Sequence, residues 1–319
     1  MTSIQELPER AMRSTLLSLS HRRRLGRLAT RLPITRLMVE RFVAGQTLAE
    51  ALGALDRLRA GGRSTTVDVL GESVSTEPAA AAAANRYLDT LDALAARGLD
   101  GNVSLKLSQM GLDLSPAVCR ANVARVFERA AATGSFVRID MEGHDHTDAT
   151  LGLWRELRSM NPNSGVVIQA ALRRSASDIG DLIAEAGRVR LCKGAYREPA
   201  AVAFQARAEV DQSYLELMTR LLREGTAPAL ATHDPGMIQA AIELARREGI
   251  GRDRFEFQML YGVRRDLQEQ LVEAGYRVRI YVPFGQEWYP YFMRRLAERP
   301  ANVMFVLRSV ANEGRHPTG

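Results

Sequence analysis

The feature that most constrains the fold is a strict alternation of short apolar runs with longer amphipathic segments. Eight runs of five or six residues, rich in β-branched and other apolar residues, have the composition of buried strands. Segments with helical apolar spacing follow the first seven runs. The predicted strands span residues 65–70, 103–107, 136–140, 166–170, 189–193, 229–233, 255–260 and 277–282, and the predicted helices span 83–97, 116–133, 149–159, 176–186, 200–223, 235–247 and 265–274.

Strands that alternate with helices form right-handed crossovers and therefore a parallel sheet. Eight such units close a (β/α)8 barrel of the TIM type, which is the α/β fold that we predict. An open doubly wound sheet is the alternative fold. Neither G-x-G-x-x-G nor G-x-x-x-x-G-K-[ST] occurs in the chain, so any nucleotide must bind without a standard phosphate loop.

The length of the chain leaves room for a segment before the barrel. Its 319 residues fit one barrel with an additional arm, although two smaller domains also suit that length. The first sixty residues have helical apolar spacing, and Gly61 and Gly62 end it. We therefore expect an α-helical arm at residues 1–64, a barrel at 65–310 and a C-terminal tail at 311–319.

Composition and charge exclude several classes of protein. With 46% hydrophobic and 25% charged residues, the chain is an ordinary globular protein, and its two cysteines suit a reducing compartment. Its apolar stretches are far shorter than the ~20 residues that span a bilayer, so we expect a cytoplasmic protein, or one bound only at a membrane surface. The net charge of +6 is small for this length, and its one arginine cluster, at residues 22–31, lies outside any nucleic-acid motif. We expect no nucleic-acid partner.

Polar residues at the ends of the predicted strands indicate where chemistry takes place. In a TIM barrel, the active site lies at the carboxyl ends of the strands. Both lysines of the chain lie there, although 41 of its 43 basic residues are arginine. Asp140 is placed to hold Lys106 or Arg190 by an ion pair. We therefore expect a pocket of organised charges that binds anions. The alternative is an ordinary layer of ion pairs at the barrel rim. The polar strand ends are Lys106, Asp140, Gln169, Arg190, Lys193, Thr232, His233 and Tyr281.

Histidines near these strand ends raise a second possibility, a metal-dependent hydrolase. His144, Asp145 and His146 form a triplet, and His233 and Asp234 are adjacent. Histidine and carboxylate side chains at strand ends are good metal ligands. The triplet lies several residues beyond its strand, however, and no cysteine or histidine pair completes a ligand set. We therefore expect no metal site.

The segment after the last predicted strand carries a second anion-binding candidate. A turn with proline and glycine leads into a predicted helix on which Trp288, Tyr291 and Arg295 are spaced to share a face, with Glu298 one turn further. Arg294 and Arg295 form a pair suited to a small carboxylate. A solvated patch of arginines is the alternative.

Six motifs, taken together, resemble one known family. They are VSLKLSQ at 103–109, RIDME at 138–142, RLCKGAY at 190–196, ATHD at 231–234, FEFQML at 255–260 and RIYVPFG at 279–285, followed by Arg294 and Arg295. In this order they resemble proline dehydrogenase, in its monofunctional bacterial form, from about residue 65 to 310. The loop at 144–146 and Met259 depart from the family pattern in minor ways.

The resemblance implies a distorted barrel that binds FAD without a Rossmann motif. It also implies oxidation of L-proline to Δ1-pyrroline-5-carboxylate, the first step of proline catabolism, with electrons passed to a membrane quinone. By resemblance, Lys106, Arg294 and Arg295 bind the proline carboxylate, Tyr281 and Leu260 pack against the proline ring, and Arg190 lies by the reactive flavin nitrogen with Asp140 as its companion. The residues implied to line the flavin are Met141, Gln169, Lys193, Gly194, Ala195, Thr232 and His233.

Overall fold

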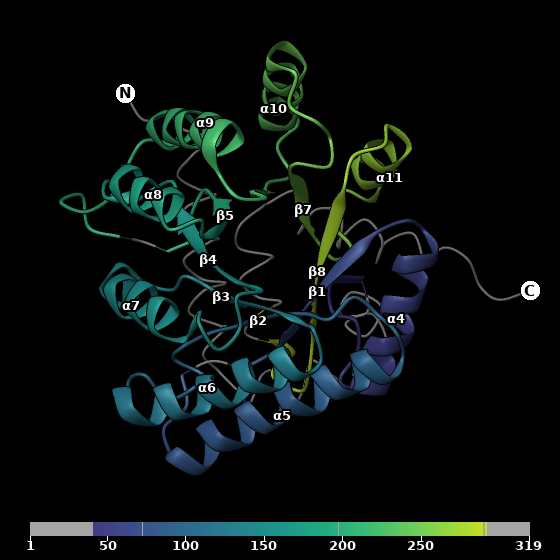
Figure 1. The fold of residues 1–319 in the computed structure, drawn as a ribbon, viewed down its shortest axis with the longest axis vertical. Coiled ribbons are helices and arrows are strands. Elements are labelled where there is room, and N and C mark those ends of the chain that lie inside the picture. The colour runs from purple at the N-terminus through teal and green to yellow at the C-terminus, as the bar shows by residue number, and fades with distance from the viewer. Residues whose placement is uncertain (1–40, 72, 197, 290, 292–319) are drawn as a thin grey trace, which may run out of the picture.

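The computed structural model describes residues 41–71, 73–196, 198–289 and 291. Its eight strands form a closed parallel barrel in which each strand pairs with the next along the chain, and β8 pairs with β1 through registers such as Val67 with Val282 (Figure 1). The predicted TIM-type barrel is confirmed, and the open doubly wound sheet is wrong because the sheet has no free edge. The strands are β1 Ser64–Val69, β2 Asn102–Leu105, β3 Phe136–Ile139, β4 Ser164–Gln169, β5 Arg188–Cys192, β6 Ala229–Ala231, β7 Glu256–Leu260 and β8 Val278–Phe284.

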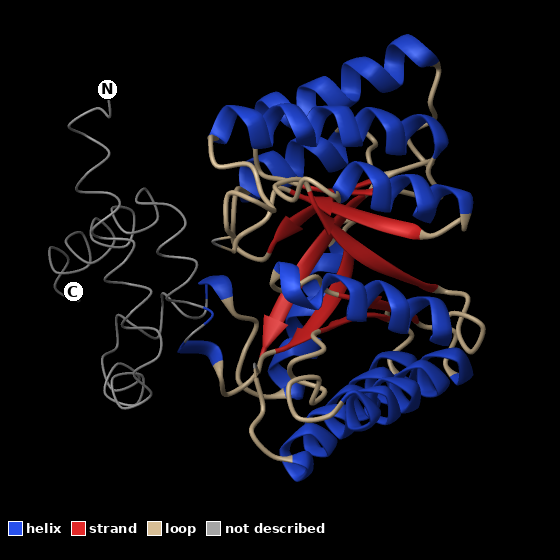
Figure 2. Ribbon diagram, turned by 90° about the vertical axis from the view of Figure 1, so that its left-hand side faces the viewer, coloured by secondary structure: helices blue, strands red, loops and turns tan. Residues whose placement is uncertain are grey.

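Helices lie outside the strands, as Figure 2 shows. Three of them, α5, α6 and α10, begin in the same way. A side-chain oxygen of Thr76, Ser115 or Asp234 caps the first turn, and a proline follows within two residues. No described helix combines the length and the apolar character that a membrane span requires. The helices are α4 Leu48–Ala60, α5 Glu77–Ala96, α6 Pro116–Ala132, α7 Thr147–Leu157, α8 Ser175–Ala184, α9 Arg207–Glu224, α10 Pro235–Glu248 and α11 Arg265–Glu273, with a 3-10 turn at His144–His146.

Helix α4, the described part of the expected arm, packs against the barrel beside β1 and β8. Thr47 and Glu50 form a capping box at its start, and Leu52 and Leu55 are buried in the common hydrophobic core. The boundary at residue 64 stays a prediction. Residues 1–40 and the tail at 311–319 lie outside the described residues.

The apolar core lies between the barrel and its helices, whereas the barrel interior is polar. Alternate residues of a barrel strand face inward, and strand register shows which ones lie at the same level. Ser104 pairs with Arg138, and Gln258 pairs with Arg279, so successive strands carry polar side chains at matching levels. These inward side chains are buried, and several inward side chains hydrogen-bond one another, for example Thr66 to Asn102 at 2.8 Å. The interior can therefore hold charged groups away from water.

Candidate active site

Four predicted residues meet at the carboxyl ends of the strands. Lys106 and Asp140 each follow the last residue of their strand, β2 and β3, while Arg190 lies on β5 and Tyr281 on β8. Asp140 Oδ1 accepts a hydrogen bond from Arg190 Nη1 at 2.7 Å, and its Oδ2 accepts one from the Tyr281 hydroxyl at 2.7 Å. Lys106 Nζ lies 3.7 Å from Asp140 Oδ2. Asp140 thus contacts both cations, as the sequence analysis expected.

Asp68 of β1 completes this cluster, although it was not among the residues predicted from the sequence. Lys106 Nζ donates to Asp68 Oδ1 at 3.1 Å, while Asp68 Oδ2 is buried with no hydrogen-bond partner among the described residues. Burial raises the pKa of Asp68, Lys106 opposes this rise, and the charge of Asp140 adds to it. A single carboxylate inside the apolar run at 65–70 was the available signal.

Arg190 is a buried cation, and one of its donor nitrogens, Nη2, has no hydrogen-bond partner among the described residues. Its side chain lies over the Tyr281 ring, with 5.2 Å between the guanidinium carbon and the ring centroid, and its Nε donates to Gln258 Oε1 at 2.5 Å. Its Nη2 is buried and has no hydrogen-bond partner within the described ranges. Because buried donors are almost always paired, this atom marks a place where a bound group can accept a hydrogen bond.

Tyr281 acts as a donor and as one wall of the site. Burial, followed by the charges of Asp140 and Asp68, raises the pKa of the phenol well above its ordinary value. The hydroxyl therefore stays protonated and keeps its bond to Asp140. Leu260 is the register partner of Tyr281 on the neighbouring strand β7, so the two side chains expected to pack against a substrate ring lie side by side.

The residues expected to line a flavin lie at the same end of the barrel. Met141 and Gln169 are buried, and Gln169 donates to the Glu142 carbonyl at 2.8 Å. Gly194 adopts φ +105°, and a Cβ there would lie 3.1 Å from Gln169 Oε1. A side chain at Gly194 would be strained and would crowd Gln169. Gly194 and Ala195 are both exposed, so their backbone is open to close approach.

Lys193 and the residues after β6 have protein partners that the sequence did not reveal. Lys193 Nζ contacts Asp211 Oδ1 at 2.5 Å and Asp234 Oδ2 at 3.1 Å. His233 Nε2 accepts the backbone N–H of Leu260 at 2.8 Å, so this nitrogen carries no proton. The buried Thr232 accepts the backbone N–H of Asp234 at 3.1 Å. These contacts fix the loop that follows β6 against β5 and β7.

Arg294 and Arg295 lie outside the described residues, and so does Glu298. Trp288 and Tyr291, which share their predicted helix face, are both buried.

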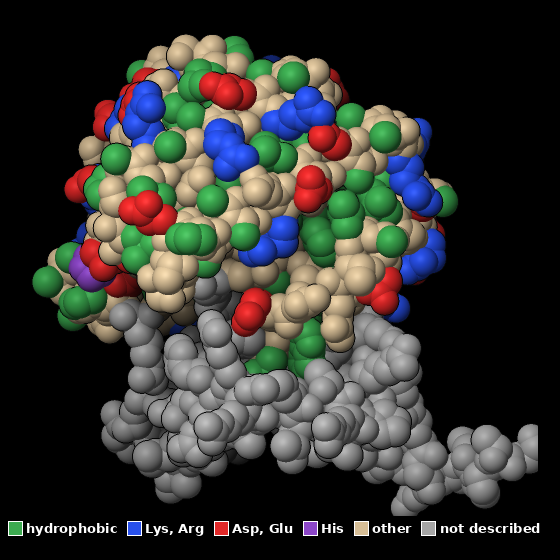
Figure 3. Space-filling view, turned by 90° about the horizontal axis from the view of Figure 1, so that it is seen from below, with side chains coloured by type: hydrophobic (Ala, Val, Ile, Leu, Met, Phe, Trp, Pro, Cys, Tyr) green, Lys and Arg blue, Asp and Glu red, His purple; other side chains and the backbone are tan. Residues whose placement is uncertain are grey.

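The two histidines of the triplet each contact a carboxylate. His144 Nδ1 lies 2.5 Å from Glu198 Oε2, and His146 Nε2 lies 3.0 Å from Asp113 Oδ1. In the part of the chain that the structure describes, no three His, Cys, Asp or Glu side chains are grouped so that they could hold a metal ion. Figure 3 shows basic and acidic side chains interspersed on one face of the molecule.

Comparison with known proteins decides the family. The family model for proline dehydrogenase matches residues 51–308. The chain belongs to the proline dehydrogenase family. The resemblance found in the six motifs is confirmed, and so is the expectation of an oxidoreductase.

Two relatives match over nearly their whole length. The chain is 41% identical over 276 residues to proline dehydrogenase 1 of Bacillus subtilis subsp. natto, covering 86% of this chain and 91% of that protein. It is 39% identical over 278 residues to the proline dehydrogenase of Deinococcus radiodurans, covering 86% of this chain and 90% of that protein.

A solved structure shares the fold. Proline utilization A (PutA) of Bdellovibrio bacteriovorus, inactivated by N-propargylglycine, matches with a TM-score of 0.77 and 29% identity. The match covers 83% of this chain and 33% of that one, so the chain spans about a third of the PutA protein.

Proposed function

We propose that this chain is an FAD-dependent proline dehydrogenase that oxidises L-proline to Δ1-pyrroline-5-carboxylate. One observation carries the proposal: the cations Lys106 and Arg190 lie around one shared carboxylate, Asp140, at the carboxyl end of a closed barrel. Family membership supports proline as the substrate and proline catabolism as the role.

The substrate side of the site is suited to an amino acid. The Lys106 side chain is 16% exposed, so its ammonium group can reach a carboxylate while Asp68 and Asp140 hold it in place. The paired forks of Arg294 and Arg295, proposed from the sequence, would complete the grip on that carboxylate. Tyr281 and Leu260 would cover the proline ring, and Tyr281 would crowd a ring hydroxyl, so we favour proline over hydroxyproline.

The cofactor side of the site fits FAD on two observations. Arg190 Nη2 is a buried donor with no partner among the described residues, and the exposed backbone of Gly194 is open to close approach. FAD, when bound, supplies the hydride-accepting chemistry that amino-acid side chains lack. Arg190 would place a permanent positive charge beside the reactive ring system and so stabilise negative charge there. Met141, Gln169, Lys193, Ala195, Thr232 and His233 would line the cofactor with Gly194.

A quinone is the proposed electron acceptor. Because quinones reside in membranes, the proposal places this chain in the cytoplasm with peripheral contact at the inner face of the cell membrane. The net charge of +6 favours an anionic surface, although each basic residue there contributes only ~1 kcal/mol.

The test is to identify the cofactor and the product of the purified chain. We expect acid treatment to release FAD at close to one per chain. With L-proline and a short-chain quinone, we expect a product that o-aminobenzaldehyde traps as the pyrroline adduct. As a matched control, Lys106→Met should keep its FAD but form little product at wild-type proline concentrations. Absence of FAD, or proline-independent reduction of the quinone, would overturn the proposal.

A further inference from the structure

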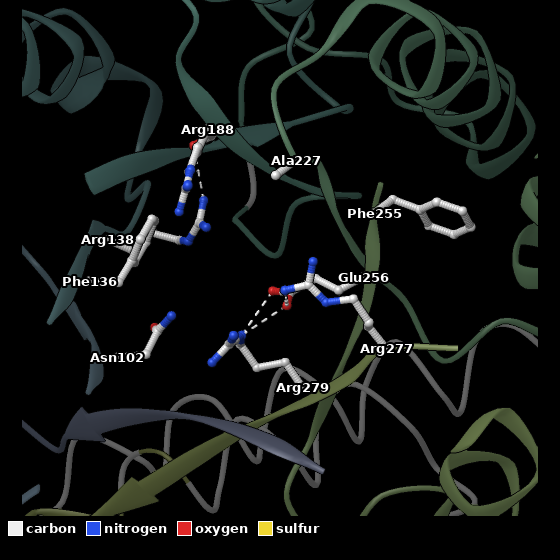
Figure 4. Close-up of a pocket in the computed structure, with 9 residues that line it drawn as sticks. All are labelled: Asn102, Phe136, Arg138, Arg188, Ala227, Phe255, Glu256, Arg277 and Arg279. Atoms are coloured by element: carbon white, nitrogen blue, oxygen red, sulfur yellow. Dashed lines mark hydrogen bonds and ion pairs between the residues drawn. The ribbon is translucent and has the colours of Figure 1, made fainter. Parts of the chain in front are cut away.

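A second pocket lies at the opposite end of the barrel, where the strands begin. It has a volume of about 340 Å³ including its open mouth, and Figure 4 shows its lining residues. Asn102, Arg188 and Glu256 are the first residues of β2, β5 and β7, and Arg277 directly precedes β8. The pocket is therefore separate from the cluster around Asp140, which lies at the carboxyl ends of the strands.

The pocket carries more positive than negative charge. Arg138, Arg188, Arg277 and Arg279 line it, and Glu256 is the one acidic residue among its described lining residues. Glu256 Oε1 lies 2.9 Å from Arg279 Nε, and Glu256 Oε2 lies 3.8 Å from Arg277 Nη2. The carboxylate of Asp100 also forms an ion pair with Arg279. Four guanidinium groups against two carboxylates leave an excess of two positive charges.

Arg138 carries one of the uncompensated charges. It is 4% exposed, and its Nη1 donates to two neutral acceptors, the carbonyls of Val166 at 3.0 Å and Arg188 at 3.1 Å. Its Nε is buried with no hydrogen-bond partner in the described part of the chain. Burial, followed by the charge of Arg190, lowers the pKa of Arg138 well below its usual range, although the charges of Glu256 and Asp140 oppose this lowering. Because a guanidinium stays protonated in proteins, Arg138 remains a buried charge without a direct carboxylate partner among the described residues.

Arg188 carries the other uncompensated charge. It is half-buried, and its Nη1 donates to the neutral side-chain oxygen of Asn163 at 2.9 Å. Like Arg138, it lies near the Phe136 ring, and neither arginine has a carboxylate partner among the described residues. In Figure 4 the guanidinium groups of Arg138 and Arg279 face the pocket from different walls.

We propose that this pocket is a binding site for a small tetrahedral oxyanion, with inorganic phosphate as the representative ligand. A guanidinium fork matches the oxygens of such an anion, and several forks converging on one small space favour a dianion over a monovalent carboxylate. The anion would neutralise the two excess charges. The exposed Ala227 and Arg277 at the mouth leave a route for it to enter.

The experiment is a calorimetric titration of the purified holoenzyme with phosphate, with sodium chloride holding the ionic strength constant. We expect saturable binding of one phosphate per chain, and no saturable binding of acetate under the same conditions. Arg188→Gln should weaken phosphate binding about tenfold or more, because it removes a charge-assisted hydrogen bond. Arg138→Gln should do the same, and if it does not fold, the half-buried Arg188 still provides the test.

Two variants locate the binding. Arg247→Gln removes an arginine on α10 that is 69% exposed and does not line the pocket, so phosphate binding should stay unchanged. Lys106→Met alters the opposite end of the barrel and should also leave it unchanged. The proposal is overturned if phosphate shows no saturable binding, if acetate binds equally well, or if Lys106→Met abolishes binding while Arg188→Gln does not.

Discussion

Replacing Tyr281 with phenylalanine tests the hydrogen bond that joins β8 to Asp140. The substitution keeps the ring and removes only the hydroxyl, which donates to Asp140 Oδ2 at 2.7 Å. A hydrogen bond to a charged group contributes about 1.5–3 kcal/mol, so Tyr281→Phe should lower the free energy of unfolding by that amount at pH 8. The remaining neighbour, Lys106 Nζ at 3.7 Å from the same oxygen, is too distant to replace the bond.

The same variant predicts a pH dependence with a definite sign. The pKa of Tyr281 is raised in the folded protein, so its contribution is fully present below pH ~10, the phenol pKa of an unfolded chain. Above that pH the unfolded chain loses a proton that the folded protein keeps. Stability then falls by about 1.4 kcal/mol per pH unit for each such tyrosine until the folded pKa is reached. Tyr281→Phe has no phenol at this position and does not lose stability in this way. The difference in the free energy of unfolding between the variant and wild type should therefore shrink above pH 10.

Urea unfolding of the holoenzyme, followed by tryptophan fluorescence at pH 8, 10 and 11, measures both effects. Tyr276→Phe is the matched control, because the Tyr276 ring packs against Phe255 and Phe257, away from this cluster. It should change stability little and leave the pH dependence intact. If Tyr281→Phe were as stable as wild type at pH 8, the assigned hydrogen bond would be wrong. If the difference in unfolding free energy between the variant and wild type stayed constant up to pH 11, the raised pKa would be wrong.

Three further predictions concern the division of the site between substrate and cofactor. Lys106→Ala should purify with its flavin bound but bind proline-like carboxylates poorly. Lys193→Ala should purify with a lower ratio of flavin to protein absorbance. The reverse pattern would show that Lys106 contacts the cofactor and Lys193 the substrate. Arg294→Lys or Arg295→Lys should raise the KM for proline roughly 10- to 100-fold with flavin retained, since lysine cannot form a bidentate ion pair with a carboxylate. Unchanged kinetics in both variants would show that the two arginines form a solvated surface patch. Tyr281→Ser should weaken proline binding and narrow the kcat/KM ratio between proline and trans-4-hydroxyproline, and an unmoved ratio would place Tyr281 away from the ring.

The barrel itself was predictable because its signal is local and repeated. The bounds of all eight predicted strands lie within three residues of the observed bounds. The reason is that the same pattern, a β-branched apolar run followed by a segment with helical apolar spacing, repeats along the chain. Helix bounds were less accurate. Helix α5 begins at Glu77 rather than residue 83, where Thr76 and Pro78 mark the start, and α9 begins at Arg207 rather than 200, where residues 199–206 form turns.

The cluster around Asp140 was predictable where its residues lie at or near a predicted strand end. Lys106 and Asp140 directly follow β2 and β3, and the carboxyl ends of barrel strands converge. Tyr281 was found because the predicted strand ended at residue 282, whereas β8 extends to Phe284 and Tyr281 lies within it. Asp68 lies inside an apolar run, and only the folded barrel, in which β1 pairs with β2, brings its carboxylate within 3.1 Å of Lys106 Nζ. Lys193 has partners on α9 and at the start of α10 that no local pattern reveals.

Anaerobic titration of the purified protein with L-proline tests the central claim most directly. We expect L-proline to bleach the absorbance of the bound flavin stoichiometrically, and Lys106→Ala, with its flavin retained, to require a much higher proline concentration. A flavin that L-proline leaves oxidised, or one that it reduces equally well in wild type and Lys106→Ala, would contradict the assignment of the cluster around Asp140 as the proline site.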